Sequence, residues 1–375
     1  MERFFHDVAE NSNADSGVFR MSEEKMYAVV IYGKEDFRYE EVPKPKPGPE
    51  EVLVKIHKAG ICAADPKIFH GKAYFSPIAY QNAPIIAGHE FIGEVVELGP
   101  GAKEKYGLEI GDKAIMEHII PCRECYYCKR GLYNLCVNGK VPGVVGVNGG
   151  WAEYMLYPKG SIIHKLPDKV SWKEAVLTEP LACAVHGVER VGVGLNDNVV
   201  IIGEGPIGLL MLEAVMEKNP NLVIVAGHHD SRLRTAKDLG ADLVINSKKE
   251  DVVERVKAET GGVGADVVLE AAGTPSAVRE AVDMLRRRGK LLIFGVYAEE
   301  AAIDWSIISD IKELEIYGGH LAPFMYPVAI RLLAEGKIDA DKIVTHDFPL
   351  KEWRKAIETA EKRIGGAIKV AMTPP

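Results

Sequence analysis

The chain of 375 residues is longer than a typical single domain of about 100–200 residues, so its length favours two folded units. With 47% hydrophobic and 27% charged residues, it has enough apolar material for sizeable cores, which excludes a disordered or collagen-like chain. The 46 basic and 54 acidic residues leave a formal net charge of -8. Neither nucleic acid nor an anionic membrane is therefore expected as the main partner.

The N-terminal segment, residues 1–25, is expected to be an extension outside the folded core, with Met21 and Met26 as alternative starts. It is acidic and has no apolar core, which argues against a secretory signal and against a transit peptide. No apolar run in the chain approaches the roughly 18 residues that a membrane span needs. A cytoplasmic location is therefore the default expectation.

Short strands separated by turns dominate the part of the chain that follows this segment. The pattern predicts strands at residues 27–32, 51–58, 90–98, 113–120 and 150–157. A proline-rich stretch, residues 42–49, is expected to form a turn between the first two strands. The spacing of these strands indicates a compact, barrel-like β unit.

From residue 198 onward, apolar strands alternate with amphipathic helices. The predicted strands are residues 199–203, 222–226, 243–246, 267–271 and 290–294. This alternation is typical of a parallel sheet covered on both faces, as in a doubly wound nucleotide-binding unit. Helices at about residues 325–334 and 350–363 and a final strand at 368–372 are expected to return to the first unit.

Four of the six cysteines, Cys122, Cys125, Cys128 and Cys136, follow the spacing C-x2-C-x2-C-x7-C. Four thiolates in a short segment can form a tetrahedral shell around zinc. The alternatives are disulfides, which suit small secreted chains, and an iron–sulfur cluster, whose last gap differs. The pattern therefore predicts a structural zinc site in a lobe at about residues 121–137.

A second set of candidate ligands is scattered along the chain and consists of Cys62, His89 with Glu90, and Glu179. A thiolate, an imidazole and one or two carboxylates make a mixed shell with room for water, which a catalytic zinc needs. Each of these residues alone is more often an ordinary core or capping residue. Their spacing alone is therefore weak support for a site.

A third feature is an apolar strand at residues 199–203 that runs into the pattern G-x-G-x-x-G. Its residues are Gly203, Gly205, Pro206, Ile207 and Gly208. The glycines allow a tight turn and a close approach of the backbone to a pyrophosphate, which then lies on the helix N-terminus. At the head of five alternating units, this motif predicts dinucleotide binding.

These three features, in this order from about residue 26 to the C-terminus, resemble the zinc-containing medium-chain dehydrogenase/reductase superfamily. The resemblance also rests on the segments 88–90, 150–154 and 179–182. It implies an α/β fold, with a GroES-like β-rich catalytic domain at residues 26–182 and 325–375 and a Rossmann coenzyme domain at residues 183–324. It further implies two zinc ions per chain, with Cys62, His89 and Glu90 holding the catalytic zinc and Glu179 as a ligand that exchanges with water.

Glutamate rather than cysteine before Pro180 resembles the sorbitol, threonine and glucose dehydrogenase branch. Residues 70–84 and 148–155 are most similar to erythritol and threitol type polyol dehydrogenases. The implied activity is oxidation of a secondary hydroxyl of a small polyol to a ketone, with hydride transfer to NAD(P). L-Threonine or an aldose is the alternative substrate. A third hypothesis is a zinc-free relative that only binds the dinucleotide, and Cys62, His89 and Glu179 together argue against it. Relatives are commonly dimers or tetramers, so a homo-oligomer is expected.

A loop between Cys62 and His89 carries aromatic residues that would lie over the substrate cleft. The candidates for lining the cleft are Tyr74, Phe75, Tyr80 and Trp151, and the alternative is that they only pack the loop.

Ala64 is a departure from the family pattern, which has serine or threonine two residues after the ligand cysteine to pass the substrate proton to solvent. The groups left for this step are zinc-bound water, Glu90 or Glu179, and Lys67. We hypothesise that Lys67 acts, provided that burial lowers the pKa of its amine; an exposed Lys67 with no substrate contact is the alternative.

Gly227 is the second departure, because an NAD enzyme places an acid there, about twenty residues past the glycine motif, to hold the adenosine ribose. Glycine leaves room for a 2′-phosphate, for which His228, His229 and Arg232 would be the partners. NADP is therefore favoured over NAD. The alternative is that Asp230 replaces the missing acid and the enzyme takes NAD or both.

The backbone at Ala272-Gly273 and at Gly295-Val296 is expected to lie along the cofactor. Thr178 and His186 are expected near the crossing between the two domains.

Overall fold

The computed structural model describes residues 21–73 and 75–375, which form two compact units. The first unit runs through Glu179 and includes His346–Ile364 and Val370–Pro375, while the second holds Pro180–Thr345 and Gly365–Lys369. Residues 180–182, 325–345 and 365–369, predicted to belong to the first unit, lie in the second. For residues 325–345, one physical reason is that the backbone N–H of Asp339 donates to the buried carboxyl of Glu213 at 2.7 Å, which ties this segment to helix α7 (Pro206–Met216).

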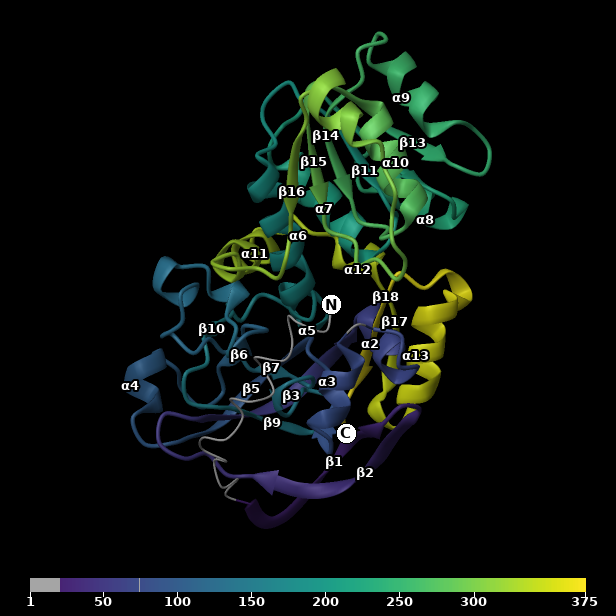
Figure 1. The fold of residues 1–375 in the computed structure, drawn as a ribbon. Helices are drawn as coiled ribbons and strands as arrows, with labels where there is room; N and C mark the ends of the chain where they lie inside the picture. The colour runs from purple at the N-terminus through teal and green to yellow at the C-terminus, as the bar shows by residue number, and fades with distance from the viewer. Residues whose placement is uncertain (1–20, 74) are drawn as a thin grey trace. The chain divides into compact units, whose positions relative to one another are not determined.

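The first unit is built mainly from antiparallel strands (Figure 1). Its strands are β1 (Met21–Gly33), β2 (Asp36–Pro45), β3 (Val52–Ile61), β4 (Ile85–Ile86), β5 (Phe91–Leu98), β6 (Lys113–Met116), β7 (Val141–Pro142), β8 (Gly146–Val147), β9 (Tyr154–Tyr157), β10 (Ile163–Lys165), β17 (Val344–Pro349) and β18 (Lys369–Thr373). Its helices are α2 (Ala64–Phe69), α3 (Ser76–Gln81), α4 (Ala102–Tyr106), α5 (Trp172–Ala175) and α13 (Trp353–Lys362), with short 3-10 turns at Cys128–Arg130, Tyr133–Leu135, Leu350–Glu352 and Ile364–Gly366.

Two larger sheets organise this unit. Strands β2, β1 and β4 form one, and the order β10-β6-β5-β3-β18-β17, with β9 also paired to β3, forms the other. Val370 of β18 lies opposite Ile61 of β3, so the C-terminal strand returns to the first unit as predicted.

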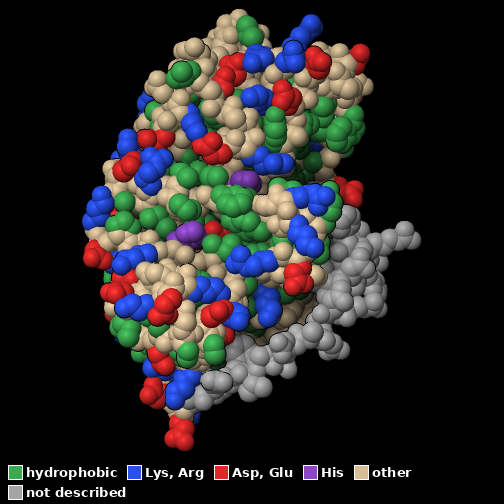
Figure 2. Space-filling view, turned by 90° about the vertical axis from the view of Figure 1, so that its left-hand side faces the viewer, with side chains coloured by type: hydrophobic (Ala, Val, Ile, Leu, Met, Phe, Trp, Pro, Cys, Tyr) green, Lys and Arg blue, Asp and Glu red, His purple; other side chains and the backbone are tan. Residues whose placement is uncertain are grey.

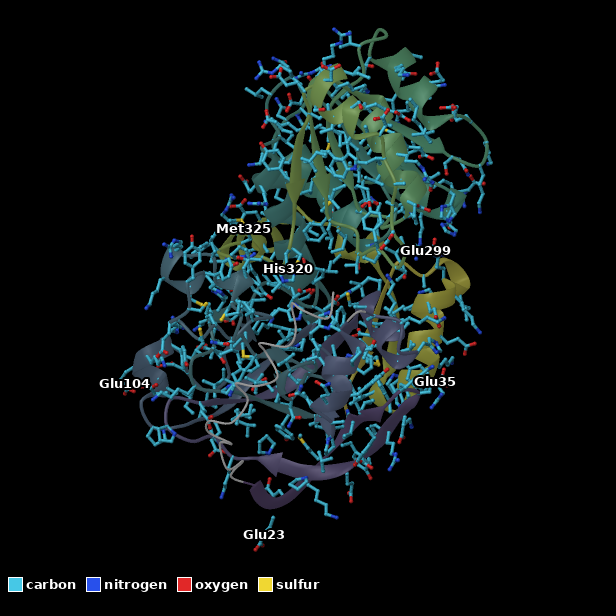
Figure 3. The ribbon with its side chains drawn as sticks, in the orientation of Figure 1. Glu23, Glu35, Glu104, Glu299, His320 and Met325 are labelled. Atoms are coloured by element: carbon cyan, nitrogen blue, oxygen red, sulfur yellow. The ribbon has the colours of Figure 1, made fainter. Side chains whose placement is uncertain are left out.

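The sheet of β1 and β2 differs from the prediction in two places. Residues 21–25, expected in the N-terminal extension, belong to β1, where Lys25 pairs with Pro43; residues 1–20 lie outside the described part. The proline-rich stretch predicted as a turn begins inside β2, which runs through Pro43 and Pro45. Prolines are tolerated there because β2 is the edge strand of its sheet. Glu23 on β1 is exposed and points outward (Figure 3).

The second unit is a six-stranded parallel sheet with helices. Helix α6 (Thr178–Val191) carries the chain into it, and its strands are β11 (Asn198–Ile202), β12 (Leu222–Gly227), β13 (Leu243–Asn246), β14 (Ala265–Glu270), β15 (Leu285–Ile293) and β16 (Glu315–Gly318). Its further helices are α7 (Pro206–Met216), α8 (Asp230–Asp238), α9 (Val252–Glu259), α10 (Pro275–Met284), α11 (Tyr326–Ala334) and α12 (Ala340–Ile343), with a π-helical turn at Ile307–Ile311. The strand order β13-β12-β11-β14-β15-β16 confirms the predicted doubly wound sheet.

Both faces of this sheet are covered, which explains why its strands are continuous apolar runs. One face packs against α9 and α10 through a core that includes Val256 and Ala281. On the other face, a Cβ at Gly187 of α6 would lie 3.0 Å from Met211 of α7 and 2.8 Å from Leu292 of β15. Helices α6 and α7 therefore pack tightly over that face (Figure 1).

On the face drawn in Figure 2, Lys and Arg side chains are interspersed with Asp and Glu among the described residues. Such mixing produces no large field of one sign on that face. Among the helices that the structure describes, none combines the length and the apolar character needed to cross a bilayer.

Candidate active site and metal centres

Cys62, His89 and Glu90 form a compact group, with one possible ligand atom of each within 4.8 Å of the others. Cys62 follows the last residue of β3, and His89 and Glu90 directly precede β5. The two strands are antiparallel neighbours, so the end of one lies beside the start of the other. The N–H of Gly60 donates to the Glu90 carbonyl at 2.9 Å, and a side chain at position 60 would overlap the Glu90 carboxylate.

Glu179 is buried in the first turn of α6. Within the described residues it lies outside the compact group of Cys62, His89 and Glu90. His118 connects it to that group, because its Nδ1 is 3.2 Å from Glu179 Oε1 and its ring stacks on His89 with centroids 4.5 Å apart. Sequence reasoning missed His118, whose only signal is a histidine just after β6 and before the cysteine lobe.

Asp65 is a further site residue that the sequence did not single out. It is buried in α2, and its Oδ2 accepts the backbone N–H of Cys62 at 2.7 Å while its Oδ1 is 3.5 Å from His89 Nδ1. Burial by itself lowers the pKa of His89, but the carboxylate of Asp65 and the neighbouring Cys62 raise that pKa well above its ordinary value. The signal that could have found Asp65 is an acidic residue three positions after the ligand cysteine.

The donor set of this group fits a divalent metal with an open position. A thiol, an imidazole and a carboxyl converge at positions from which most solvent is excluded, and buried groups of these kinds need a charged partner. Asp65 faces Nδ1 of His89, which leaves Nε2 as the nitrogen available to a metal.

The four lobe cysteines lie together as the spacing predicts. Their four sulfur atoms lie within 4.8 Å of one another, and none of the four cysteines forms a disulfide. Backbone N–H groups of Cys122 and Cys125 point to the sulfurs of Cys136 and Cys122 at 3.3 and 3.4 Å. The backbone N–H of Cys128 is the main cause that lowers the pKa of Cys125 to about 6, whereas burial raises the pKa of Cys128 and of Cys136.

The glycine motif forms the predicted strand, turn and helix. Gly203 has a φ of +116°, which only glycine adopts without strain, and a Cβ there would lie 3.0 Å from backbone atoms of Ala271 and Ala272. Gly205 directly precedes α7, and Pro206 is the first residue of that helix, a position where proline is well tolerated. A side chain at Gly208 would overlap the Gly203 carbonyl, so the helix packs directly on the turn.

Glu204, in the turn between β11 and α7, is a further residue that sequence reasoning missed. This side chain from the glycine turn is buried and lies against Gly227, with its Oε1 accepting the N–H groups of His228 and His229 at 3.1 and 3.0 Å. Arg232, expected as a phosphate partner, is buried on α8 and donates to the carbonyl of Ala367.

Glu270, at the end of β14, organises the backbone expected to lie along the cofactor. It is fully buried, and its Oε1 accepts the N–H groups of Ala272 and Gly273 at 2.8 and 2.6 Å. Its Oε2 accepts the hydroxyl of Tyr297 at 2.8 Å, and a Cβ at Gly295 would lie 2.6 Å from the same oxygen. Sequence reasoning missed Glu270, which lies inside the strand predicted at residues 267–271. Val296, next to Gly295, is exposed.

Thr178 and His186 both lie on α6. Thr178 is fully buried and its hydroxyl donates to the carbonyl of Ala175 at 2.7 Å. Burial, with smaller effects of Arg190 and His320 (labelled in Figure 3), lowers the pKa of His186 to about 4. The His186 side chain is therefore uncharged near neutral pH.

Lys67 is half-buried on α2, where its carbonyl accepts the N–H of Lys72 at 2.7 Å. Its role in proton transfer stays a prediction.

Two of the four aromatic candidates for the cleft lining, Trp151 and Tyr80, form hydrogen bonds within the first unit. Trp151 is fully buried and its Nε1 donates to the Gly60 carbonyl at 3.2 Å, and the Tyr80 hydroxyl donates to the carbonyl of Ile68. Phe75 is half-buried at the start of α3, and Tyr74 lies outside the described residues.

Comparison with known proteins follows the same division of the chain. Residues 48–168 match the family model described as alcohol dehydrogenase GroES-like domain, and residues 206–335 match the one described as zinc-binding dehydrogenase. An erythritol/L-threitol dehydrogenase of Mycolicibacterium smegmatis is 40% identical over 94% of this chain and 98% of its own length. An L-threonine 3-dehydrogenase of Pyrococcus horikoshii is 39% identical over 87% of this chain and 92% of its own length.

Among solved structures, a Sinorhizobium meliloti protein with bound NADP superimposes with a TM-score of 0.86 at 30% identity, covering 94% of this chain and 100% of that one. Matches of this length and identity extend over both units and over all three sets of candidate site residues. The chain therefore belongs to the zinc-binding alcohol dehydrogenase family, with its GroES-like and Rossmann-type domains, as its sequence motifs predict.

Proposed function

We propose that this chain oxidises a secondary hydroxyl of a small polyol to a ketone and transfers the hydride to NAD(P). The observation that carries the proposal is the buried group of Cys62, His89 and Glu90, with Glu179 held beside it by His118. The similarity to an erythritol/L-threitol dehydrogenase supports a polyol as the substrate class.

Cys62 and His89 would hold the catalytic zinc, with Glu90 and Glu179 as the carboxylates available to it. A zinc ion held there would supply polarisation of the hydroxyl oxygen, and a bound nicotinamide would supply the acceptor for the hydride. Asp65 keeps the Cys62 backbone and the His89 ring in place, so that the thiol and Nε2 converge. The low exposure of His89 and Glu90 keeps bulk water away from this centre.

The hydroxyl proton must leave without the usual serine or threonine, since position 64 is alanine. We keep Lys67, half-buried on the helix that also carries Asp65, as the proposed proton carrier.

The proposal also includes the finer expectations from the sequence. The chain would hold two zinc ions, the second one bound by Cys122, Cys125, Cys128 and Cys136, and would act as a cytoplasmic dimer or tetramer. For the cofactor, Gly227 alone favours NADP over NAD, whereas the Glu204 carboxylate beside it opposes a 2′-phosphate. The proposed function therefore names NAD(P) as the cofactor.

L-Threonine is the second candidate substrate, favoured by the 39% identity to an L-threonine 3-dehydrogenase, and an aldose is a third. A zinc-free relative is a weaker alternative, because the convergence of a thiol, an imidazole and a carboxyl has no purpose in a protein that only binds a dinucleotide.

The test is a rate panel on the purified, zinc-replete enzyme with erythritol, threitol, sorbitol, xylitol, threonine, glucose and ethanol, each with NAD and with NADP. Fastest turnover of a four- or five-carbon polyol supports the proposal. Activity confined to threonine, glucose or ethanol replaces the substrate class. A zinc content of two per chain supports the metal assignment, and no zinc refutes it.

A further inference from the structure

The space beside Gly227 is filled by a carboxylate from another element. In the structure, Oε2 of Glu204 occupies the volume that a Cβ at position 227 would take, and Cδ of Glu204 lies against the same position. Glu204 comes from the glycine turn between β11 and α7, whereas Gly227 is the last residue of β12. The two positions are neighbours because β11 and β12 pair in parallel, with Ile202 opposite Ala226.

The Glu204 carboxylate is held in one orientation. Its Oε1 accepts the N–H groups of His228 and His229 at 3.1 and 3.0 Å, and lies 2.6 Å from Nδ1 of His229. All three of these hydrogen bonds end on Oε1, so Oε2 is the oxygen that faces the end of β12. Burial raises the pKa of Glu204, but the backbone N–H groups and the His229 ring outweigh this effect and keep the pKa below its ordinary value. An anionic carboxylate therefore stands at the end of β12 although residue 227 is glycine.

The other candidates for binding the adenosine ribose are committed elsewhere. Asp230 accepts from Lys249 Nζ at 2.8 and 2.9 Å and from Asn246 Nδ2 at 2.6 Å, so it is tied to the end of β13. Arg232, the strongest candidate partner for a 2′-phosphate, is buried and donates to the Ala367 carbonyl. Within the described part of the chain, the hydrogen bonds and the ion pair of the Glu204 carboxylate are with His228 and His229.

A metal ion is a poor explanation for this cluster, although donor atoms of Glu204, His228 and His229 lie within 4.8 Å of one another. The 2.6 Å separation of Glu204 Oε1 and His229 Nδ1 is a hydrogen bond, and two ligands of one ion, each about 2.0–2.2 Å from it, would lie farther apart.

We propose that Glu204 selects the cofactor: its carboxylate takes the place of the strand-end acid, accepts hydrogen bonds from the 2′- and 3′-hydroxyls of the adenosine ribose and repels a 2′-phosphate, so that the enzyme favours NAD over NADP. This proposal rests on the dinucleotide binding of the proposed function and replaces the NADP preference expected from Gly227. Glycine is needed at position 227 because any side chain there would collide with Glu204, not because a phosphate must fit.

The first test is equilibrium binding of NADH and of NADPH to the full-length enzyme, followed by nicotinamide fluorescence. We expect the unaltered enzyme to bind NADH at least about tenfold more tightly than NADPH. The Glu204 carboxylate would accept hydrogen bonds from the ribose hydroxyls of NADH and would repel the 2′-phosphate of NADPH. Glu204→Gln keeps an acceptor for the N–H groups of His228 and His229 and removes the charge. It should reduce the NADH-to-NADPH preference by about tenfold or more, mainly by strengthening NADPH binding.

The second test moves the acid to its usual position. Glu204→Ala should lose the preference, and Glu204→Ala with Gly227→Asp should restore it, because the aspartate then has the space that Glu204 vacates. Asp230→Asn is the matched control and should leave the ratio unchanged. Thermal unfolding of each variant checks that the second unit stays folded.

The proposal is overturned if the unaltered enzyme binds NADPH more tightly than NADH. It is also overturned if Glu204→Gln keeps the full preference for NADH, or if Asp230→Asn loses that preference. These measurements need neither substrate nor catalytic zinc. Their failure is therefore distinguishable from a failure of the polyol assignment, which the rate panel tests.

Discussion

Glu213 offers a quantitative test of the second unit, because it is a buried carboxyl that forms no ion pair with the residues that the structure describes. It lies on α7, its Oε1 accepts the N–H of Asp339, and in the described part of the chain its Oε2 is buried without a hydrogen-bond partner. Burial is the main cause that raises the pKa of Glu213 from its ordinary 4.5 to about 7. The folded unit therefore binds a proton more tightly than the unfolded chain does.

The sign and size of the effect follow from this difference. A carboxyl whose folded pKa is raised contributes stability that is fully present below pH 4.5 and is lost as the pH rises through 7. A pKa difference of about 2.5 corresponds to about 3 kcal/mol, which is an upper bound because the buried site can relax or admit water. Glu213→Gln keeps an acceptor for Asp339 and has no proton to lose.

The assay is the thermal unfolding midpoint of the unaltered protein and of Glu213→Gln at pH 5.5 and pH 8.5. Other titrating groups are shared by both proteins and cancel in the difference between them. Between pH 5.5 and pH 8.5 only about 1.5 of the 2.5 pKa units is crossed, which corresponds to about 2 kcal/mol. We therefore expect the unfolding midpoint of Glu213→Gln, relative to that of the unaltered protein, to rise by up to about 4–8 °C from the lower to the higher pH in a unit of this size. Glu254→Gln, an exposed carboxyl on α9, is the control and should show no such change. A difference between the two proteins that is the same at both pH values would refute the reasoning.

Three further predictions test other parts of the structure. Cys122→Ser should lower the zinc content from two to one per chain by elemental analysis and lower the unfolding midpoint, while unchanged zinc content would contradict the four-cysteine site. Glu270→Ala leaves the N–H groups of Ala272 and Gly273 without their acceptor. We therefore expect the free energy of unfolding to fall by about 1–3 kcal/mol for each N–H group left without an acceptor, and NADH to bind more weakly. An unchanged cofactor affinity would count against a positioning role of Glu270. Lys67→Ala should change the pH dependence of kcat, and an unaltered pH–rate profile would exclude Lys67 as proton carrier.

The elements that could be predicted from the sequence are those that short-range patterns specify. The strand at residues 243–246 is found at the predicted bounds, and the strand at 222–226 extends by one residue, to Gly227. Strand β16 was missed because Glu315–Gly318 is mostly exposed and has no apolar run. The edge strand β2 was mistaken in part for a turn, because proline is a local signal and the edge position of a strand is not.

The same distinction applies to the candidate site. The lobe cysteines and the glycine turn could be predicted because their geometry is set within a few residues along the chain. Asp65, His118 and Glu270 could not, because what makes each of them part of a site is the partner that the fold places beside it.

The sequence by itself therefore determined the two-unit α/β organisation, the four-cysteine lobe and the dinucleotide turn, since each depends on local spacing and on the periodicity of apolar residues. Only the tertiary structure decided that Cys62 and His89 meet, through the antiparallel pairing of β3 and β5. Tertiary structure also decided which residue supplies the anion at the end of β12. The parallel pairing of β11 and β12 brings Glu204 to Gly227, and no local rule relates these two positions.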